Sequence, residues 1–572
     1  MRAWYRDLVL RLTLALAVLV VPGCADNFDE DLKAVQDAPF LSTGATVATT
    51  GVLPTTTGAD GTTGASTTGG FGETTGDSVV TTSTDTSTSG DVDSSSSSSS
   101  SGAALPPPAV LETDMPGKVA LAGPVSFAAT TAHATSARAK LDGVDIGVLH
   151  DDGAGIFSGA LAIYGAMDNG PHMLEVIAER EELSDHESVP FVVSTPAPGT
   201  VAWAMPGPAG SRTRRIALTP ERDVIEVGSW VVAGLQRPAI RKRSGLTGAE
   251  MWAESTLLLD NHEGWATDVA VAPDGRLWVA MNVRDAANVW RPRIRLLDAT
   301  GVFTGVEIPA EAGQTVSGID NDGTGGCVAV GYAPSGKGDL DVLVWRINGE
   351  HVPVLSGKPW DYQPANKLPH EFTDLATDVV VQDGVAWIVG MSSGKHDKEE
   401  FTYLRGILVP LNLHTGLPAG PVIVAPPDHP WFQSAFHGAA LHPEGLLVTG
   451  YGCDDTCTTY RIETSRYSVD GKRTGFAPGL KNSGLAYGSD VTLDSQGRAL
   501  VAGAVTQNGT LRGYVFGRSG GGDGPIVFDL WYPGVGPSEA LGIVRDSYDR
   551  IFPAGYITVD GEAQARVTLI HG

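Results

Sequence analysis

Three aspartates occupy equivalent positions in three copies of one short pattern. The copies read ATDVAVAPDG, ATDVVVQDG and GSDVTLDSQG, and at the entry of their first apolar strand stand Asp268, Asp378 and Asp490. A hydroxyl residue precedes each aspartate, namely Thr267, Thr377 and Ser489. If the three strands converge, these side chains form a site for a cation or a polar ligand, and Ca²⁺ is the ion that such oxygen ligands suit.

The same aspartates have a structural alternative. Asp side chains often accept hydrogen bonds from backbone N–H groups of their own loop. At or near this place the four other copies carry Arg215, Val316, Gly438 and Gly542. A symmetric ring of acids is therefore not expected. His437 either joins the ligand-binding residues from one of these copies or has a structural role.

The cysteines suggest export and little chemistry. Cys453 and Cys457 lie in GYGCDDTCTTY, and in an exported protein such a pair is expected to form a disulfide that closes a five-residue loop. A metal site would need two more soft ligands, and none is evident nearby. Cys327 lies in the middle of the apolar run GGCVAVG, which predicts a buried free thiol.

The aspartates belong to a repeated β-hairpin. A short apolar strand runs into an Asp/Gly turn, and a second apolar strand ends at a small residue. The pattern recurs at steps of 50–60 residues, closing at Gly228, Met281, Gly331, Gly390, Gly450, Gly503 and Gly555. A later strand in each copy also ends at a glycine-containing turn. Seven copies of four antiparallel strands predict an all-β, seven-bladed β-propeller over residues 199–572, with the aspartates around one mouth of its channel.

The two ends of this array complement each other. The sequence ends at Gly572, where the seventh copy still lacks its fourth strand. Residues 201–228 align without a gap to residues 528–555, so that VAWAM matches the fourth strand of the sixth copy. We expect Val201 to Met205 to complete the last blade and leave no open edge. The limits of the first blade stay open, because VVAG (231–234) is another candidate for its second strand.

The copies resemble the NHL-like and related β-propeller repeats of bacterial exported proteins. In that group a Pro-Asp-Gly turn follows the innermost strand, as PDG does at residues 273–275. The resemblance covers residues 201–572. It implies the fold and specifies no activity, since propellers serve many functions.

The N-terminus has the features of a targeting segment. Arg2, Arg6 and Arg11 flank the start of LTLALAVLVV (12–21), an apolar run too short for a permanent transmembrane helix. The following VPGC resembles the lipobox of bacterial lipoproteins, which implies that residues 1–23 are a signal peptide and that Cys24 carries lipid. An ordinary secretory signal with a chance cysteine is the alternative. Asp26 resembles an inner-membrane retention signal, whereas the long polar segment after it favours the outer membrane or cell surface.

Two further segments precede the repeats. Residues 24–109 are rich in Ser, Thr and Gly, with LPPP near the end, and cannot bury enough apolar surface to fold. We expect a disordered tether with an average span of about 50 Å. Residues 110–198 show alternating apolar runs, and YGAMDNGPHMLEVIAE (164–179) is similar to the late-strand signature of bacterial immunoglobulin-like domains. That resemblance implies a β-sandwich acting as a spacer or adhesive unit.

Composition limits the possible functions. The chain has 39 Lys and Arg against 66 Asp and Glu, a net charge of -27, which argues against nucleic-acid binding and suits a soluble monomer. No nucleophile elbow, phosphate-binding loop or His-rich metal motif stands out. We expect a lipid-anchored surface protein that binds a protein or glycan without enzymatic activity. A secreted hydrolase or lyase acting on an extracellular polymer, and a periplasmic scaffold, are the alternatives.

Overall fold

The computed structural model describes residues 105–164, 168–252, 257–335, 339–360, 373–394, 403–425, 433–454, 459–482, 484–533 and 536–572. Apart from short 3₁₀ turns such as η2 (Gly520–Gly522), the regular structure in these ranges is β, which confirms the all-β prediction. The predicted signal peptide, Cys24 and nearly all of the tether lie outside the described residues. Within the described ranges, no helix has the length and apolar character needed to span a membrane.

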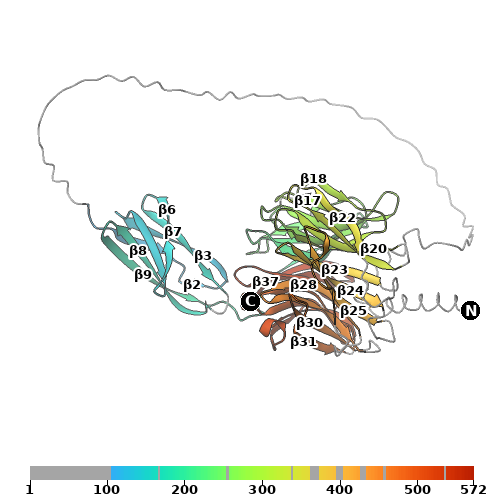
Figure 1. Ribbon diagram of the computed structural model, residues 1–572. Coiled ribbons are helices and arrows are strands. Elements are labelled where there is room, and N and C mark those ends of the chain that lie inside the picture. The colour runs from blue at the N-terminus through green and yellow to red at the C-terminus, as the bar shows by residue number, and fades with distance from the viewer. Residues whose placement is uncertain are drawn as a thin grey trace, which may run out of the picture. The chain divides into compact units, whose positions relative to one another are not determined.

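Residues 109–193 form two sheets around one apolar core (Figure 1). In β8 (Gly170–Arg180) the buried side chains alternate with more exposed ones, as expected where one face of a sheet meets water. The first sheet has the order β1 (Ala109–Asp114), β3 (Gly123–Ala132), β7 (Ile156–Ile163), β6 (His150–Gly153). The second has the order β2 (Lys118–Val119), β9 (Leu183–Val193), β8, β4 (Ser136–Leu141), β5 (Val144–Val148).

The described residues from 201 onward form seven more antiparallel sheets, numbered here by the order of their first strands. Sheet 1 comprises β11 (Arg212–Leu218), β12 (Val224–Val232), β13 (Leu235–Arg243) and β14 (Leu257–Leu258). Sheet 2 comprises β15 (Gly264–Val271), β16 (Leu277–Arg284), β17 (Trp290–Leu297) and β18 (Phe303–Pro309). Sheet 3 comprises β19 (Thr315–Asn321), β20 (Cys327–Pro334), β21 (Leu340–Ile347) and β22 (Pro353–Trp360).

The remaining four sheets follow the same order along the chain. Sheet 4 comprises β23 (Thr373–Gln382), β24 (Val385–Gly394), β25 (Tyr403–Asn412), β26 (Leu417–Pro418) and β27 (Ile423–Val424). Sheet 5 comprises β28 (Gln433–His442), β29 (Gly445–Cys453), β30 (Tyr460–Ser468) and β31 (Arg473–Asn482). Sheet 6 comprises β32 (Ala486–Leu493), β33 (Ala499–Gln507), β34 (Thr510–Arg518) and β35 (Ile526–Trp531). Sheet 7 comprises β36 (Ser538–Arg545), β37 (Arg550–Val559), β38 (Glu562–His571) and β10 (Val201–Ala209).

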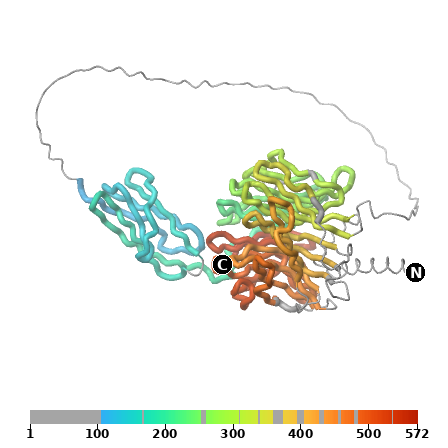
Figure 2. The backbone as a smooth tube through the Cα atoms, in the orientation of Figure 1, coloured from blue at the N-terminus to red at the C-terminus, as the bar shows by residue number. Residues whose placement is uncertain are grey.

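These sheets pack as the blades of a β-propeller, and Figure 2 follows the chain through them from green to red. The first strands contact one another in cyclic order, from β11 through β15, β19, β23, β28 and β32 to β36, which packs back against β11. Neighbouring sheets cover both faces of the strands between them, so that seven successive residues of β16 are buried. The first strands therefore surround the centre of the ring.

The last sheet is completed by the earliest strand of the array. β10 pairs antiparallel with β38, with Val201 opposite Ile570 and Met205 opposite Val567. This confirms the prediction that Val201 to Met205 supply the missing fourth strand, which would otherwise leave the edge of β38 unpaired. The two candidates for the second strand of the first blade merge, because β12 contains both residues 224–228 and Val231–Val232.

Candidate functional site at the centre of the ring

Every first strand of the ring contains a β-bulge at the same place. A bulge inserts one residue in one strand and re-aims the side chains beside it. From sheet 1 to sheet 7, the residues directly after the bulge are Arg215, Asp268, Gly318, Asp378, Gly438, Asp490 and Gly542. Aspartate and glycine thus alternate over sheets 2 to 7, and arginine takes the remaining place, in sheet 1. Val316, predicted for this position in sheet 3, lies two residues too early.

Each of the three predicted site aspartates joins its own sheet to the next. In all three, Oδ1 accepts the N–H of the following residue at 2.8 Å. Oδ2 accepts an N–H from the next sheet, donated by the residue after that sheet's glycine. The donors are Ile319 to Asp268 at 2.8 Å, Ala439 to Asp378 at 3.0 Å and Ile543 to Asp490 at 2.8 Å. The aspartates therefore accept backbone N–H groups, as the structural alternative predicts. Half of these bonds, however, cross to the next sheet.

The alternating glycines are required because each of them lies close to the first strand of the sheet that follows. A Cβ atom on Gly438 would lie 2.7 Å from the Cα atom of Asp490 in the next sheet. A Cβ on Gly318 would lie 2.9 Å from the Cα of Asp378. Aspartate therefore reaches forward to the next sheet, and the glycine there leaves room for the first strand of the sheet beyond it.

A fourth aspartate, absent from the predicted set, makes the same kind of link. Asp320 lies two residues after Gly318, and its carboxylate accepts the N–H of Asn321 at 2.7 Å and of Val381 in sheet 4 at 2.7 Å. Burial raises its pKa to about 7. Its displacement by two residues from the other aspartates hid it from an alignment based on the hairpin repeat.

The residues inserted by the bulges also bond within the ring. Thr267 donates to a carbonyl of its own sheet at 3.2 Å. Thr377 donates to the carbonyl of Phe436 in sheet 5 at 2.8 Å, and His437 Nδ1 lies 3.0 Å from the carbonyl oxygen of Gly488 in sheet 6. These three predicted ligand-binding residues therefore hold neighbouring strands.

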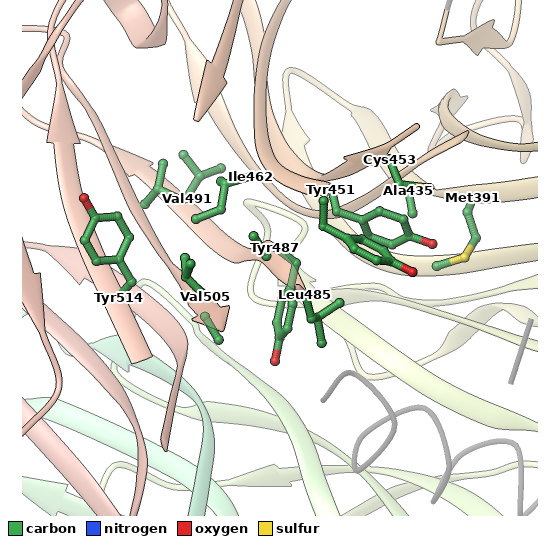
Figure 3. Close-up of a cluster of buried hydrophobic side chains, with 14 of the residues drawn as sticks. Met391, Ala435, Tyr451, Cys453, Ile462, Leu485, Tyr487, Val491, Val505 and Tyr514 are labelled. Carbon is green, nitrogen blue, oxygen red and sulfur yellow. The ribbon is translucent and has the colours of Figure 1, made fainter. Parts of the chain in front are cut away.

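His437 and Ser489 lie inside the packed ring. Burial lowers the pKa of His437 to about 4, so its imidazole is neutral at pH 7. The imidazole lies 5.6 Å from the ring centroid of Tyr451 and 5.9 Å from that of Tyr487, two side chains of the buried cluster in Figure 3. The Ser489 hydroxyl is buried and has no hydrogen-bond partner among the described residues. The prediction that these residues bind a ligand gains no support from this geometry.

Arg215 supplies the positive charge at the ring centre. Its guanidinium donates to the carbonyl of Leu541 in sheet 7 and, at 3.3 Å, to that of Ser489 in sheet 6. Burial opposes its charge, but Asp490, Asp378 and Asp268 together raise the pKa of Arg215 above its ordinary value. One arginine therefore balances part of the charge of three carboxylates.

The three carboxylates hold their protons more tightly than an ordinary aspartate does. Burial, opposed by Arg215, raises the pKa of Asp268 to about 7 and that of Asp378 to about 8, and it also raises the pKa of Asp490. Among the described residues, no three His, Cys, Asp or Glu side chains form a group that could hold a metal ion. The predicted Ca²⁺ site on these aspartates therefore gains no support.

One more buried carboxylate near the bulges was missed by sequence reasoning. Glu539, three residues before the bulge position of sheet 7, accepts hydrogen bonds from the hydroxyls of Tyr487 and Tyr556, the latter at 2.5 Å. All three side chains are buried. Its oxygens are occupied by protein donors, as those of the aspartates are.

The cysteine predictions have different outcomes. Cys327 is buried and free, as predicted, and burial raises the pKa of its thiol well above the ordinary value. Cys453 is also buried, but Cys457 lies outside the described residues. The disulfide between them stays a prediction.

Comparisons with known proteins give distant likenesses. The chain matches no protein-family model and no curated protein. Among solved structures it is similar to the β-propeller domain of the trilobed protease from Pyrococcus furiosus (10% identity, 65% of this chain and 94% of that chain, TM-score 0.36). It is also similar to Drosophila semaphorin 2a (8%, 66% and 76%, 0.42) and the periplasmic gluconolactonase of Pseudomonas aeruginosa (11%, 61% and 96%, 0.39). With TM-scores below 0.5, these likenesses carry no argument, and the β-propeller assignment comes from the sheet order and packing.

Proposed function

We propose that this protein is a lipid-anchored envelope protein whose propeller binds a protein or glycan ligand without converting it. The observation that carries the proposal is the state of the acids at the ring centre. A general acid or base must reach the substrate directly or through one water. Asp268, Asp378 and Asp490 instead accept two backbone N–H groups each, so they hold sheets together.

The proposal is tested by measuring binding and turnover in the same experiment. The full chain is incubated with a panel of glycans and peptides. Each bound compound is then recovered, and its mass is measured by mass spectrometry. We expect saturable binding with unchanged ligand mass. Cleavage of any compound, lost in an Asp378→Asn variant, would instead support the hydrolase or lyase alternative.

We further propose that the seven sheets are the blades of a closed seven-bladed propeller and that residues 109–193 are an immunoglobulin-like sandwich. The pairing of β10 with β38 and the cyclic packing of the first strands support the first point. Deleting residues 199–206 should lower the melting temperature of the whole propeller. An unchanged melting temperature would contradict closure by β10.

The anchor is proposed from VPGC at residues 21–24 and from the polar segment that follows it. In cells fed a clickable fatty acid, the wild-type chain should carry the label and a Cys24→Ser variant should not. Protease added to intact cells should then cleave the chain if the anchor is in the outer membrane and the tether faces outward. Equal labelling of both chains would contradict lipidation at Cys24.

A further inference from the structure

Sheet 4 has an outer strand that is broken in two. β26 and β27 both pair with β25, and the segment AGPV (419–422) separates them. Pro421 has no backbone N–H to donate, so the ladder cannot run unbroken through this segment. At the break, Pro410 of β25 has no strand on its outer side and keeps one backbone bond there, from the N–H of Ala419 at 2.8 Å, while its inner side pairs with Trp387 of β24.

A cavity of about 260 Å³ lies beside this break. Its apolar lining includes Trp387 from β24, Pro410 from β25 and Ile423 from β27. The turn after β30 in sheet 5 forms another wall. That turn comes so close that a Cβ on Gly471 would lie 2.6 Å from a side-chain carbon of Ile423.

Two carboxylates from different sheets also line this cavity, and both are exposed. Asp383 lies in the two-residue Asp-Gly turn between β23 and β24, where its φ is 50°. Asp470 lies in the turn of sheet 5. The Ser468 hydroxyl donates a hydrogen bond to the Asp470 carboxylate and thereby lowers the pKa of Asp470. Lys472 lowers this pKa further, by a smaller amount. Asp470 is thus ionised at neutral pH.

These two carboxylates differ from Asp274 and Asp546, which also lie in hairpin turns of the ring but have an arginine partner. Asp274 accepts a bond from Arg276 at 2.6 Å, and Asp546 accepts one from Arg550 at 2.6 Å. Within the described part of the chain, no Lys, Arg or His side chain forms an ion pair with Asp383 or with Asp470. The cavity therefore has two negative charges that lack an arginine partner.

We propose that this cavity binds an alkylammonium group: an aliphatic stem that lies along the apolar wall and ends in a cation between Asp383 and Asp470. Three features of the cavity support that ligand class. Its volume is below the roughly 300–1,000 Å³ of pockets for drug-sized ligands, so it suits a single side chain. Trp387 adds an aromatic side chain of the kind that attracts cations, and the apolar residues suit methylene groups.

This inference gives the proposed binding role one site and one ligand class, and it rests on that proposed function. The alkylammonium group has two possible sources, a lysine side chain of a protein partner or a free diamine. Binding to the full chain is measured by calorimetry with N-acetyl-lysine methylamide, with cadaverine and with N-acetyl-norleucine methylamide, which lacks the charge. We expect either amine to bind at least tenfold more tightly than the norleucine compound. The tighter of the two amines identifies the source.

The variants locate the site. Asp383→Asn and Asp470→Asn should each weaken amine binding at least fivefold. The matched control is Asp560→Asn, since Asp560 lies in an equivalent Asp-Gly turn between β37 and β38 with a φ of 51° and should have no effect. Equal binding of the amines and the norleucine compound would overturn the inference, as would equal effects of Asp383→Asn and Asp560→Asn. Absence of amine binding in a chain that still binds glycans or peptides would overturn the inference and leave the proposed function standing.

Discussion

The sequence favours the aspartates at the ring centre as binding residues, whereas the structure favours those at the outer cavity. Asp268, Asp378 and Asp490 recur in aligned repeats, which makes them conspicuous, yet each one has both oxygens bonded to backbone amides. Asp383 and Asp470 belong to ordinary turns, yet they line a cavity, and among the described residues neither forms an ion pair with a Lys, Arg or His side chain. The partners of a carboxylate, and not its recurrence, distinguish a structural acid from a candidate binding acid.

This comparison also explains why the ring centre needs three residue types. The aspartates link sheets 2 and 3, 4 and 5, and 6 and 7, whereas the glycines of sheets 3 and 5 leave room for Asp378 and Asp490 of the sheet that follows. Because the number of sheets is odd, sheet 1 has no partner in this pairing, and Arg215 occupies its bulge position. Its charge makes the burial of three carboxylates tolerable, because unpaired buried charges are costly.

The largest effect is expected from Arg215→Met. Removing the cation leaves the carboxylates uncompensated, which should lower the free energy of unfolding by about 3 kcal/mol at pH 8, as in other broken buried pairs. Chemical denaturation of the full chain measures this loss. The control is Arg284→Met, because the Arg284–Glu263 pair at 3.2 Å is partly exposed on both sides (25% and 41%) and should contribute at most about 1 kcal/mol. Equal losses in the two variants would contradict a special role for Arg215.

Gly438→Ala should have the next largest effect. The new methyl group would lie 2.7 Å from the Cα of Asp490, so the first strands must move apart, at a cost of about 1–3 kcal/mol. Gly420→Ala is the control, because its Cβ would meet only Pro410, at 3.6 Å. A Gly438→Ala chain as stable as the control would show that the ring centre is not closely packed.

The pH dependence of stability isolates the carboxylates. The pKa of Asp378 is about 8 in the folded chain and about 4 in an unfolded one, so the folded chain binds more protons between these values. The associated stability is fully present below pH 4 and is lost as the pH rises through 8. Between pH 6.5 and 9 the wild type should therefore lose roughly 1–2 kcal/mol more than an Asp378→Asn variant does.

Melting curves of the two chains across this pH window make the measurement. Their difference cancels the contributions of titrating groups that do not interact with Asp378, and His437 is neutral throughout the window because its pKa is about 4. Parallel pH profiles would mean that Asp378 is already ionised in the folded chain.

The smallest effect is expected from Asp383→Asn. Among the described residues this side chain forms no ion pair, and asparagine tolerates the same left-handed turn. The free energy of unfolding should stay within about 0.5 kcal/mol of the wild type. A loss as large as that of Asp378→Asn would remove the distinction between the two groups of aspartates.

The strands of the ring could be predicted from the sequence, but the contacts between neighbouring sheets could not. The repeat spacing and the match of VAWAM to a fourth strand were enough to predict that β10 pairs with β38. The bulges add one residue within a strand and leave the hairpin pattern intact, and the alignment placed Val316 where the structure has Gly318. The partners of the aspartates lie in the next sheet, 51–61 residues away, where no local pattern links donor and acceptor.

The cavity was beyond sequence reasoning for a similar reason. The break in the outer strand of sheet 4 is visible as AGPV, but the wall that faces it comes from the turn at Asp470, almost 50 residues later. Only the packing of sheet 5 against sheet 4 brings Gly471 to Ile423.

One measurement tests the contrast between the two groups directly: the affinity of N-acetyl-lysine methylamide for the wild-type, Asp268→Asn and Asp383→Asn chains, at a temperature where all three are folded. The account predicts that Asp268→Asn, although less stable, binds like the wild type, whereas Asp383→Asn binds at least fivefold more weakly. Loss of affinity in Asp268→Asn with full affinity in Asp383→Asn would contradict it, because the acids at the ring centre would then bind the ligand.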